Sequence, residues 1–238
     1  KKASPRMREF LKSAVGLTAI GTVADVVPLV DENRVIVRYG MHSLRENPSL
    51  GLQALLKVAG LHHKAQLTAE DAAFGIAPRI NAAGRLGQAR LAVEMLTTDN
   101  AERAVSLAAY VDELNNNRKT VERRILKEAK EQIDANPDWE AHPTLVLAHH
   151  DWHPGVIGIV ASRIGEMFEK PTVMISLKDD GTGQGSARSF AGFDMYAALN
   201  ACRGCLLGCG GHKAAAGLQI EGKRVEEFRT SLCNWASA

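Results

Sequence analysis

The sequence predicts an α/β protein with a helical first half and strands confined to the second half. Apolar residues recur at steps of three or four through most of residues 6–135, which is the spacing of amphipathic helices. Compact apolar runs suited to buried strands begin only at TLVLAH, residues 144–149. Hydrophobic residues make up 45% of the 238 positions, enough for one large core or two smaller ones. We therefore expect two units, a helix-rich one followed by a compact mixed-sheet α/β one.

The helical half is expected to contain five helices before a much longer one. Pro28 ends the first helix, Asn47-Pro48 follows the second, and Thr68 with Asp71 resembles a capping box. We interpret the string APRINAAGRLG as irregular. The expected helices cover residues 6–30, 31–45, 49–59, 68–76 and 88–96.

A single long helix is predicted from Asn100 to about Ala135. Its apolar positions follow one another mostly at steps of three or four, with Arg118 filling a gap in the seam, and Asn136-Pro137 ends it. A helix of this length most often connects two units, and an ordinary surface helix is the alternative.

The second half alternates strands and helices. Strands are predicted at 144–149, 171–177, 185–190 and 215–220, and helices at 154–168, 194–202 and 225–235. The expected organisation is a helical region at 1–100, a connecting helix at 101–136 and an α/β domain at 137–238.

Charge is distributed too evenly to indicate a polyanion partner by itself. The formal net charge is +2; residues 1–100 hold 13 basic and 9 acidic side chains, a local excess of +4. An anion site must therefore be built from a few placed groups. No apolar run approaches the ~20 residues of a membrane span, and no signal peptide is evident. We expect a cytoplasmic protein without membrane association, and a chain starting Lys1-Lys2 is expected to be a fragment.

Three of the four cysteines stand close together, as C-x2-C-x3-C-x2-H from Cys202 to His212. This spacing matches no common structural zinc site, and leucines surround the cysteines. Packing as small buried hydrophobes is the favoured interpretation, and zinc is the alternative.

Two candidate groups lie in the helical half. Asp25 is a lone carboxylate in the apolar stretch GLTAIGTVADVVPL, where a buried charge requires a metal, an arginine or a helix end as partner. The string PRINAAGR places Arg79, Asn81 and Arg85 on an expected loop, where guanidinium groups suit a phosphodiester or a carboxylate. Surface ion pairing is the alternative.

Three candidate motifs lie in the second half. The string HHDWHPG at 149–155 resembles a set of metal ligands, but we expect its side chains mainly to orient a strand-to-helix turn. In GSARS, Ser186 and Arg188 share one face if the segment is extended, with Ser189 on the other. GGHKAAAG at 210–217 is an open, donor-rich loop suited to an anion.

Together these strings resemble RecJ-type single-stranded-DNA exonucleases of the DHH phosphoesterase superfamily. The matching strings are GTVADVVPL, APRINAAGRL, HHDWHPGVIGIVASR, GQGSARS and GGHKAAAG, spread over nearly the whole chain. The resemblance implies the C-terminal part of a DHH catalytic domain, a connecting helix and a DHH-associated substrate-binding domain.

The resemblance also implies residue roles and a reaction. His212 would stabilise the scissile phosphate, and Asp25 would ligate one ion of a two-metal Mn²⁺ or Mg²⁺ centre that activates water. The implied substrate is single-stranded DNA, cleaved 5′→3′ in repair and recombination, with a single-strand-binding protein or a helicase as partner. The implied nucleic-acid-binding residues are Arg79, Asn81, Arg85, Ser186, Arg188, Ser189, Gly210 and Gly211.

The chain departs from the family pattern in what it lacks. The Asp-His-His motif and the Asp-x-Asp ligands are absent, so we expect the chain alone to be inactive. Two other functions stay open: a phosphodiesterase for oligoribonucleotides or cyclic dinucleotides, and a non-catalytic nucleic-acid-binding module.

Overall fold

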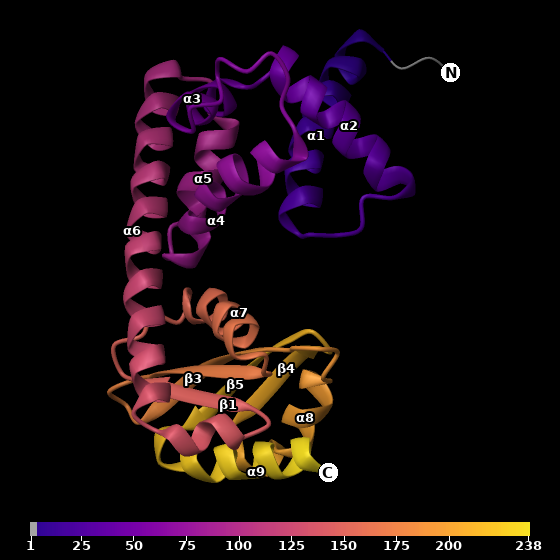
Figure 1. Ribbon diagram of the computed structural model, residues 1–238. Coiled ribbons are helices and arrows are strands. Elements are labelled where there is room, and N and C mark those ends of the chain that lie inside the picture. Colours follow the sequence, from indigo (N-terminus) through magenta and orange to yellow (C-terminus); the bar gives the residue numbers. More distant parts are fainter. Residues whose placement is uncertain (1–3) are drawn as a thin grey trace. The chain divides into compact units, whose positions relative to one another are not determined.

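The computed structural model describes residues 4–238, and the chain divides into two compact units. The division falls between Arg118 and Lys119, inside the long helix α6 (Ala101–Asp134). Figure 1 follows the chain from the helices of the first unit to the sheet of the second. The predicted α/β class, helix-rich at first and mixed-sheet afterwards, is confirmed.

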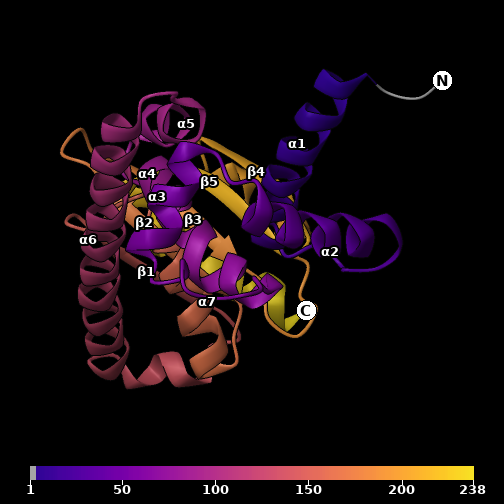
Figure 2. The same cartoon turned by 90° about the horizontal axis from the view of Figure 1, so that it is seen from above.

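The first unit consists of helices around one aliphatic core. The pair α1 and α2 is visible in Figure 2 and packs closely, because a Cβ on Gly40 would lie 2.2 Å from the Cβ of Ala19. Ser43 ties the same pair, donating to the Lys12 carbonyl at 2.6 Å. The helices of this unit before α6 are α1 (Pro5–Ala24), α2 (Asp31–Glu46), α3 (Leu50–Val58), α4 (Ala77–Arg85) and α5 (Ala89–Thr97).

The predicted first helix is too long, because α1 ends at Ala24. Asp25 is its C-terminal cap, and Val26 follows with φ of 59°, a left-handed conformation that breaks the helix before Pro28. The next predicted helix is present as α2, beginning at Asp31. The apolar pattern runs on beyond Ala24, so periodicity alone did not reveal this break.

The string APRINAAGRLG is helical where an irregular segment was expected. A π-helical segment, Asp71–Ile76, continues directly into α4. Pro78 is tolerated because it lies in the first turn, where its missing N–H has no intrahelical acceptor. Thr68 and Asp71 bond each other as the capping box predicted.

Asp71 is the charged group that anchors the start of the π-helical segment. Burial raises the pKa of its carboxyl, but hydrogen bonds from Lys64 and Thr68 outweigh burial and hold the pKa below its usual value.

Helix α6 confirms the predicted long helix to within one residue at each end. The seam buries Leu107 and Val111 in the core of the first unit, and Ile125 and Ile133 in that of the second. Asn100 caps its start by accepting the Arg103 N–H at 2.9 Å.

The second unit is built on one five-stranded sheet in the order β1-β2-β3-β5-β4. β1 and β2 are parallel and the other pairs are antiparallel. Helix α7 covers one face and helices α8 and α9 cover the other (Figure 1). The elements are β1 (Leu145–His149), α7 (Ile157–Phe168), β2 (Thr172–Leu177), β3 (Thr182–Arg188), α8 (Met195–Ala201), β4 (Gly208–His212), β5 (Ala215–Glu221) and α9 (Val225–Ser237).

The GGH segment is a strand, whereas the sequence suggested a loop. Gly208–His212 forms β4 at the edge of the sheet, and Lys213-Ala214 makes a tight turn into β5. Glycine-rich runs have low strand propensity, so no strand was predicted here. The third predicted strand is present but begins earlier, at Thr182.

Candidate functional site

The sheet register brings the predicted residues of the second unit onto one face. Ser186 lies opposite Gly217 of β5, which lies opposite Gly210 of β4. Arg188 lies opposite Ala215, which lies opposite His212. Directly opposed residues point to the same side of a sheet, so two parallel rows run across three strands. At a strand spacing of about 4.8 Å, the backbones of Arg188 and His212 lie about 10 Å apart.

Arg188 and Ser186 form a pair at one side of these rows, as the sequence predicted from their alternation. The Arg188 guanidinium donates to the Ser186 hydroxyl at 2.9 Å and to the Ala187 carbonyl at 2.8 Å. The pair lies against the first turn of α7, because a Cβ on Gly158 would be 2.6 Å from Arg188 and 2.8 Å from the Ser186 oxygen. Gly158 therefore makes room for the pair, a role that sequence reasoning missed.

The two glycines of β4 differ in what they require. Gly211 has φ of 147°, and a Cβ there would lie 2.5 Å from the Ala215 carbonyl oxygen. Gly210 faces open space, with nothing within 4 Å of an added Cβ. Gly211 is needed for the backbone to fold, and Gly210 keeps the surface clear.

His212 is exposed at the end of β4, with its ring orientation fixed by the following turn. Its Nδ1 accepts the Ala214 N–H at 3.3 Å. The neutral ring therefore carries its proton on Nε2, a donor directed away from the turn.

Ser186, Arg188, Gly210 and Gly211 border a shallow groove of about 300 Å³ in the second unit. Small residues form its floor and the Arg188–Ser186 pair supplies its polar wall. A second hollow of about 400 Å³ shares Gln184, Gly185, Gly210 and Gly217 with it. A cationic fork beside an unobstructed backbone suits an extended phosphodiester. The groove residues are Pro154, Ile157, Gln184, Gly185, Ser186, Arg188, Gly210, Gly211, Ala215, Ala216 and Gly217.

Ser189 lies beyond this groove. Its hydroxyl donates to the Phe193 carbonyl at 2.6 Å, and its N–H bonds Ala214. The geometry gives the predicted contact of Ser189 with nucleic acid no support.

The histidines of HHDWHPG shape the turn between β1 and α7, as expected. His149 Nδ1 accepts the Asp151 N–H and His153 Nδ1 accepts the Gly155 N–H, each at 3.1 Å. Trp152 is buried and donates to Glu128 at 2.8 Å. The turn therefore positions the start of α7, where Ile157 borders the groove.

The first unit holds a separate hollow of about 730 Å³ between α1, α4 and α5. Asp25, Asn81 and Arg85 contribute to its wall. Asn81 and Arg85 share a helix face because they are four residues apart in α4. The structure thus brings together three residues that the sequence singled out.

The expectation that Asp25 is buried in an apolar run is wrong. Because α1 ends one residue earlier, Asp25 is exposed at the C-terminal cap. An exposed carboxylate remains hydrated and needs no buried counter-charge.

Arg79 lies on another side of α4 and does not line this hollow. Its Nε donates to Asp112 at 2.7 Å and its Nη1 donates to the Gly75 carbonyl at 2.6 Å. The ion pair matches the alternative reading of this arginine, and the geometry gives its predicted contact with nucleic acid no support.

The described residues do not form a divalent-metal centre. No group of three or more His, Cys, Asp or Glu suited to a metal occurs among residues 4–238. Asp25 supplies one carboxylate to a hollow that Arg85 also lines, whereas Mg²⁺ takes six oxygen ligands.

The clustered cysteines pack in the core of the second unit, as favoured from sequence. Cys202 and Cys205 are buried against α8 and α9. Burial, with a smaller effect of the neighbouring Cys205, raises the pKa of Cys202 to about 11.

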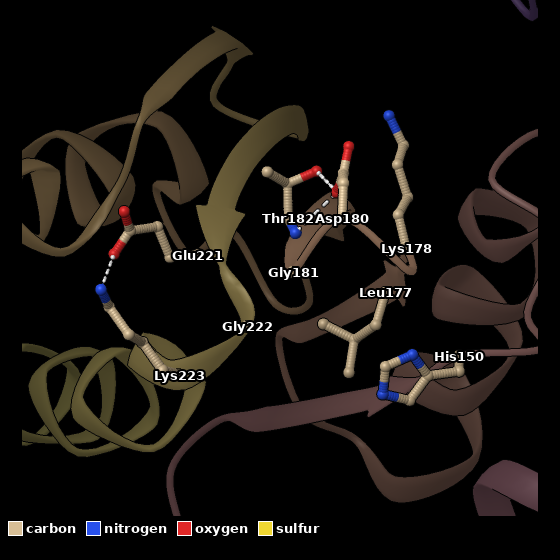
Figure 3. Close-up of a pocket in the computed structure, with 9 residues that line it drawn as sticks. All are labelled: His150, Leu177, Lys178, Asp180, Gly181, Thr182, Glu221, Gly222 and Lys223. Atoms are coloured by element: carbon tan, nitrogen blue, oxygen red, sulfur yellow. Dashed lines mark hydrogen bonds and ion pairs between the residues drawn. The ribbon is translucent and has the colours of Figure 1, made fainter.

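Another hollow of the second unit, of about 510 Å³, lies at the turn between β2 and β3 (Figure 3). Its charges are largely satisfied locally: Lys223 pairs with Glu221 at 3.1 Å, and Asp180 accepts two hydrogen bonds from Thr182. Because its positive and negative side chains are balanced in this way, the hollow favours neither an anion nor a cation.

Comparison with protein families finds a match within the second unit. Residues 142–238 match the model of the DHHA1 domain. The groove of β3, β5 and β4 therefore lies within the segment that matches the DHHA1 model, together with the arginine–serine pair and the GGH strand.

The resemblance to RecJ-type exonucleases is confirmed over nearly the whole chain. The chain is 38% identical to the single-stranded-DNA-specific exonuclease RecJ of Bacillus subtilis over 98% of its length, and 39% identical to that of Escherichia coli over 95%. The crystal structure of Thermus thermophilus RecJ with Mg²⁺ matches with a TM-score of 0.85 at 37% identity, over 95% of this chain and 34% of that one. The chain spans only 29% and 40% of the two curated relatives.

No helix in the described part of the chain is long and apolar enough to span a membrane.

Proposed function

We propose that this chain is the strand-binding part of a RecJ-type, metal-dependent exonuclease that hydrolyses single-stranded DNA from the 5′ end. The observation that carries the proposal is the groove of the DHHA1 domain. Ser186, Arg188 and Gly210 line it. The sheet register places His212 on the same face, opposite Ala215. The similarity to RecJ over 95% or more of the chain supports single-stranded DNA as the ligand.

The groove residues and His212 each have a distinct proposed role toward a strand. Arg188 presents its guanidinium to non-bridging phosphate oxygens, with Ser186 holding the fork in place. The glycine floor lets the sugar–phosphate backbone approach the sheet closely. His212 donates its Nε2–H to a phosphate oxygen and stabilises the charge that develops there during cleavage.

In the first unit, we propose that Asn81 and Arg85 contact a phosphate in the hollow that Asp25 borders. Residues 1–100 then form the C-terminal part of a DHH catalytic domain, 101–136 a connecting helix and 137–238 the substrate-binding domain.

Mn²⁺ and Mg²⁺ are the ions we propose for the complete enzyme, in line with RecJ structures solved with each. A cytoplasmic location fits this role. The proposed protein partners are a single-strand-binding protein or a helicase.

The chain on its own is proposed to bind DNA without cleaving it. Asp25 supplies only one carboxylate, and the described residues contain no group of three or more metal ligands. This separation allows binding to be measured without turnover.

Binding of a fluorescein-labelled oligothymidylate, followed by anisotropy in EDTA, tests the groove. Arg188→Gln removes the charge, and Gly210→Val narrows the groove at a position where an added Cβ meets nothing within 4 Å. Both variants should weaken binding, whereas Arg203→Gln, an exposed arginine outside the groove, should not. Wild-type affinity in both groove variants, with melting temperatures unchanged, would contradict the proposal.

The role of His212 is tested in a full-length RecJ relative carrying alanine at the histidine of its GGH motif. Binding retained with a large loss of kcat supports stabilisation of the cleavage step. Equal cleavage by wild type and variant would leave the histidine a binding residue only and refute its catalytic role.

A further inference from the structure

A basic cleft runs along α2 in the first unit, apart from the residues assigned above. Its volume is about 510 Å³. Helix α2 forms one wall and the segment 65–69 forms the other. No aspartate or glutamate is among its lining residues, which are Val37, Arg38, Tyr39, Met41, His42, Arg45, Ala65, Gln66, Leu67, Thr68 and Ala69.

The basic residues of the cleft form a stripe along the helix. Arg38, His42 and Arg45 follow one another at steps of four and three, which places them on one face of α2. Arg34 extends the same face by one turn towards the N-terminus. Arg38 and Arg45 are separated by about 10 Å along the helix axis, from a rise of about 1.5 Å per residue.

Arg38 and Arg45 lack the ion pairs that other arginines of this unit make. Within residues 4–238, neither has a hydrogen bond or a salt bridge from its side chain, whereas Arg79 pairs with Asp112 and Arg103 with Glu94. The sequence explains this, because no acidic residue stands three or four positions from either one. Two guanidinium groups thus face the cleft uncompensated.

The positive charge continues beyond the Arg45 end of the cleft. The pKa of His62 is lowered, first by burial and then by the positive charges of His63, Lys57 and Arg45. In the described structure, the buried Nδ1 of His62 has no hydrogen-bond partner. Repulsion between neighbouring cations is relieved when an anion binds among them.

The cleft also offers flat apolar surface beside its charges. Tyr39 is 62% exposed, although it is a large aromatic side chain. Val37, Met41 and Leu67 are buried beneath the cleft and make its floor apolar. A row of cations next to an exposed aromatic ring suits a single strand, in which phosphates alternate with bases that stack. An acidic peptide would satisfy the charges but would not use the ring in this way.

We propose that the α2 cleft is a second binding surface for single-stranded nucleic acid, which holds the strand by its phosphates without reading its sequence. This inference rests on the proposed function only in taking a single strand as the ligand. The surface belongs to the first unit alone, so it contributes affinity independently of the groove in the DHHA1 domain.

The test compares Arg38→Gln/Arg45→Gln with wild type, using the labelled oligothymidylate in EDTA over a range of salt. Two lost phosphate contacts should weaken binding about two- to thirtyfold. The slope of log affinity against log salt should fall by about 1.4, from about 0.7 per contact. Tyr39→Ala should weaken binding with the salt slope unchanged, because stacking releases no counterions.

Arg6→Gln/Arg123→Gln is the matched control, since it removes two exposed arginines that line neither the cleft nor the groove. If the cleft variant and this control lose the same affinity, the effect is only one of net charge and the inference fails. It also fails if the cleft variant weakens binding of labelled polyglutamate but not of oligothymidylate. Failure of the proposed function is distinguishable, because wild type itself would then not bind the oligonucleotide.

Discussion

The geometry of β4 predicts opposite outcomes for alanine at its two adjacent central glycines. Gly211→Ala places a Cβ 2.5 Å from the Ala215 carbonyl oxygen and 2.5 Å from the Ala216 Cα, in a backbone with φ of 147°. Gly210→Ala meets nothing within 4 Å. The same chemical change is therefore made at neighbouring positions with opposite steric consequences.

The expected magnitudes are well separated. A non-glycine residue in a sparsely populated backbone region costs about 1–3 kcal/mol, and forcing extra volume into a packed site costs about 1–3 kcal/mol more. Gly211→Ala should therefore destabilise the second unit by about 2–6 kcal/mol. Gly210→Ala should be neutral, or stabilising by up to about 1 kcal/mol through the entropy of the unfolded chain.

Tryptophan fluorescence during urea unfolding reports this domain selectively. All three tryptophans lie in the second unit: Trp139, Trp152 and Trp235. A midpoint for Gly211→Ala equal to that for Gly210→Ala, with equal slopes, would refute the argument from backbone geometry.

Four further predictions concern single groups elsewhere in the chain. The carboxyl of Asp71 has a lowered pKa in the folded protein, so its charge stabilises the fold above its ordinary pKa of 3.8, and this stabilisation is lost as pH falls through the folded value. Asp71→Asn should therefore lower the melting temperature, measured by circular dichroism, more at neutral pH than at about pH 3. Cys202, with a pKa of about 11, should escape iodoacetamide at about pH 8 in native protein and react after unfolding, as mass spectrometry would show. Arg79→Gln and Asp112→Asn should each destabilise the first unit, and the double variant should lose less than the sum because the partners bond at 2.7 Å; additive losses would contradict that pairing. Calorimetric titration of the chain with Mn²⁺ should show no binding tighter than about millimolar, and Asp25→Asn should not change the result.

The parts of the fold that follow from local pattern were predictable from the sequence. Helix α6 repeats apolar residues along 34 positions, and its ends carry an Asn cap and a following proline. The strands β1 and β2 are short apolar runs buried on both faces of the sheet. In each case the local signal and the tertiary environment agree.

The elements that were missed are those in which tertiary contacts override local preference. β4 is Gly-Cys-Gly-Gly-His, a poor strand sequence that is held extended by β5. The helix predicted to end at Ile76 instead continues as α4 through Pro78, which periodicity treats as a break. The position of Asp25 depended on a helix end set by one left-handed residue, Val26.

In the candidate site, the sequence reveals which residues of one strand share a face, but not how neighbouring strands pair. Ser186 and Arg188 could be assigned to one face because they are two residues apart in one strand. The sequence could not place His212 on that face, because its side depends on two strand pairings: Arg188 with Ala215, and Ala215 with His212. A shift of one residue in either register would turn His212 away from Arg188. Gly211 fixes the second of these pairings, because only glycine accepts its φ against Ala215 and Ala216. The conformation of Gly211 therefore determines whether the histidine and the arginine lie on the same face of the sheet.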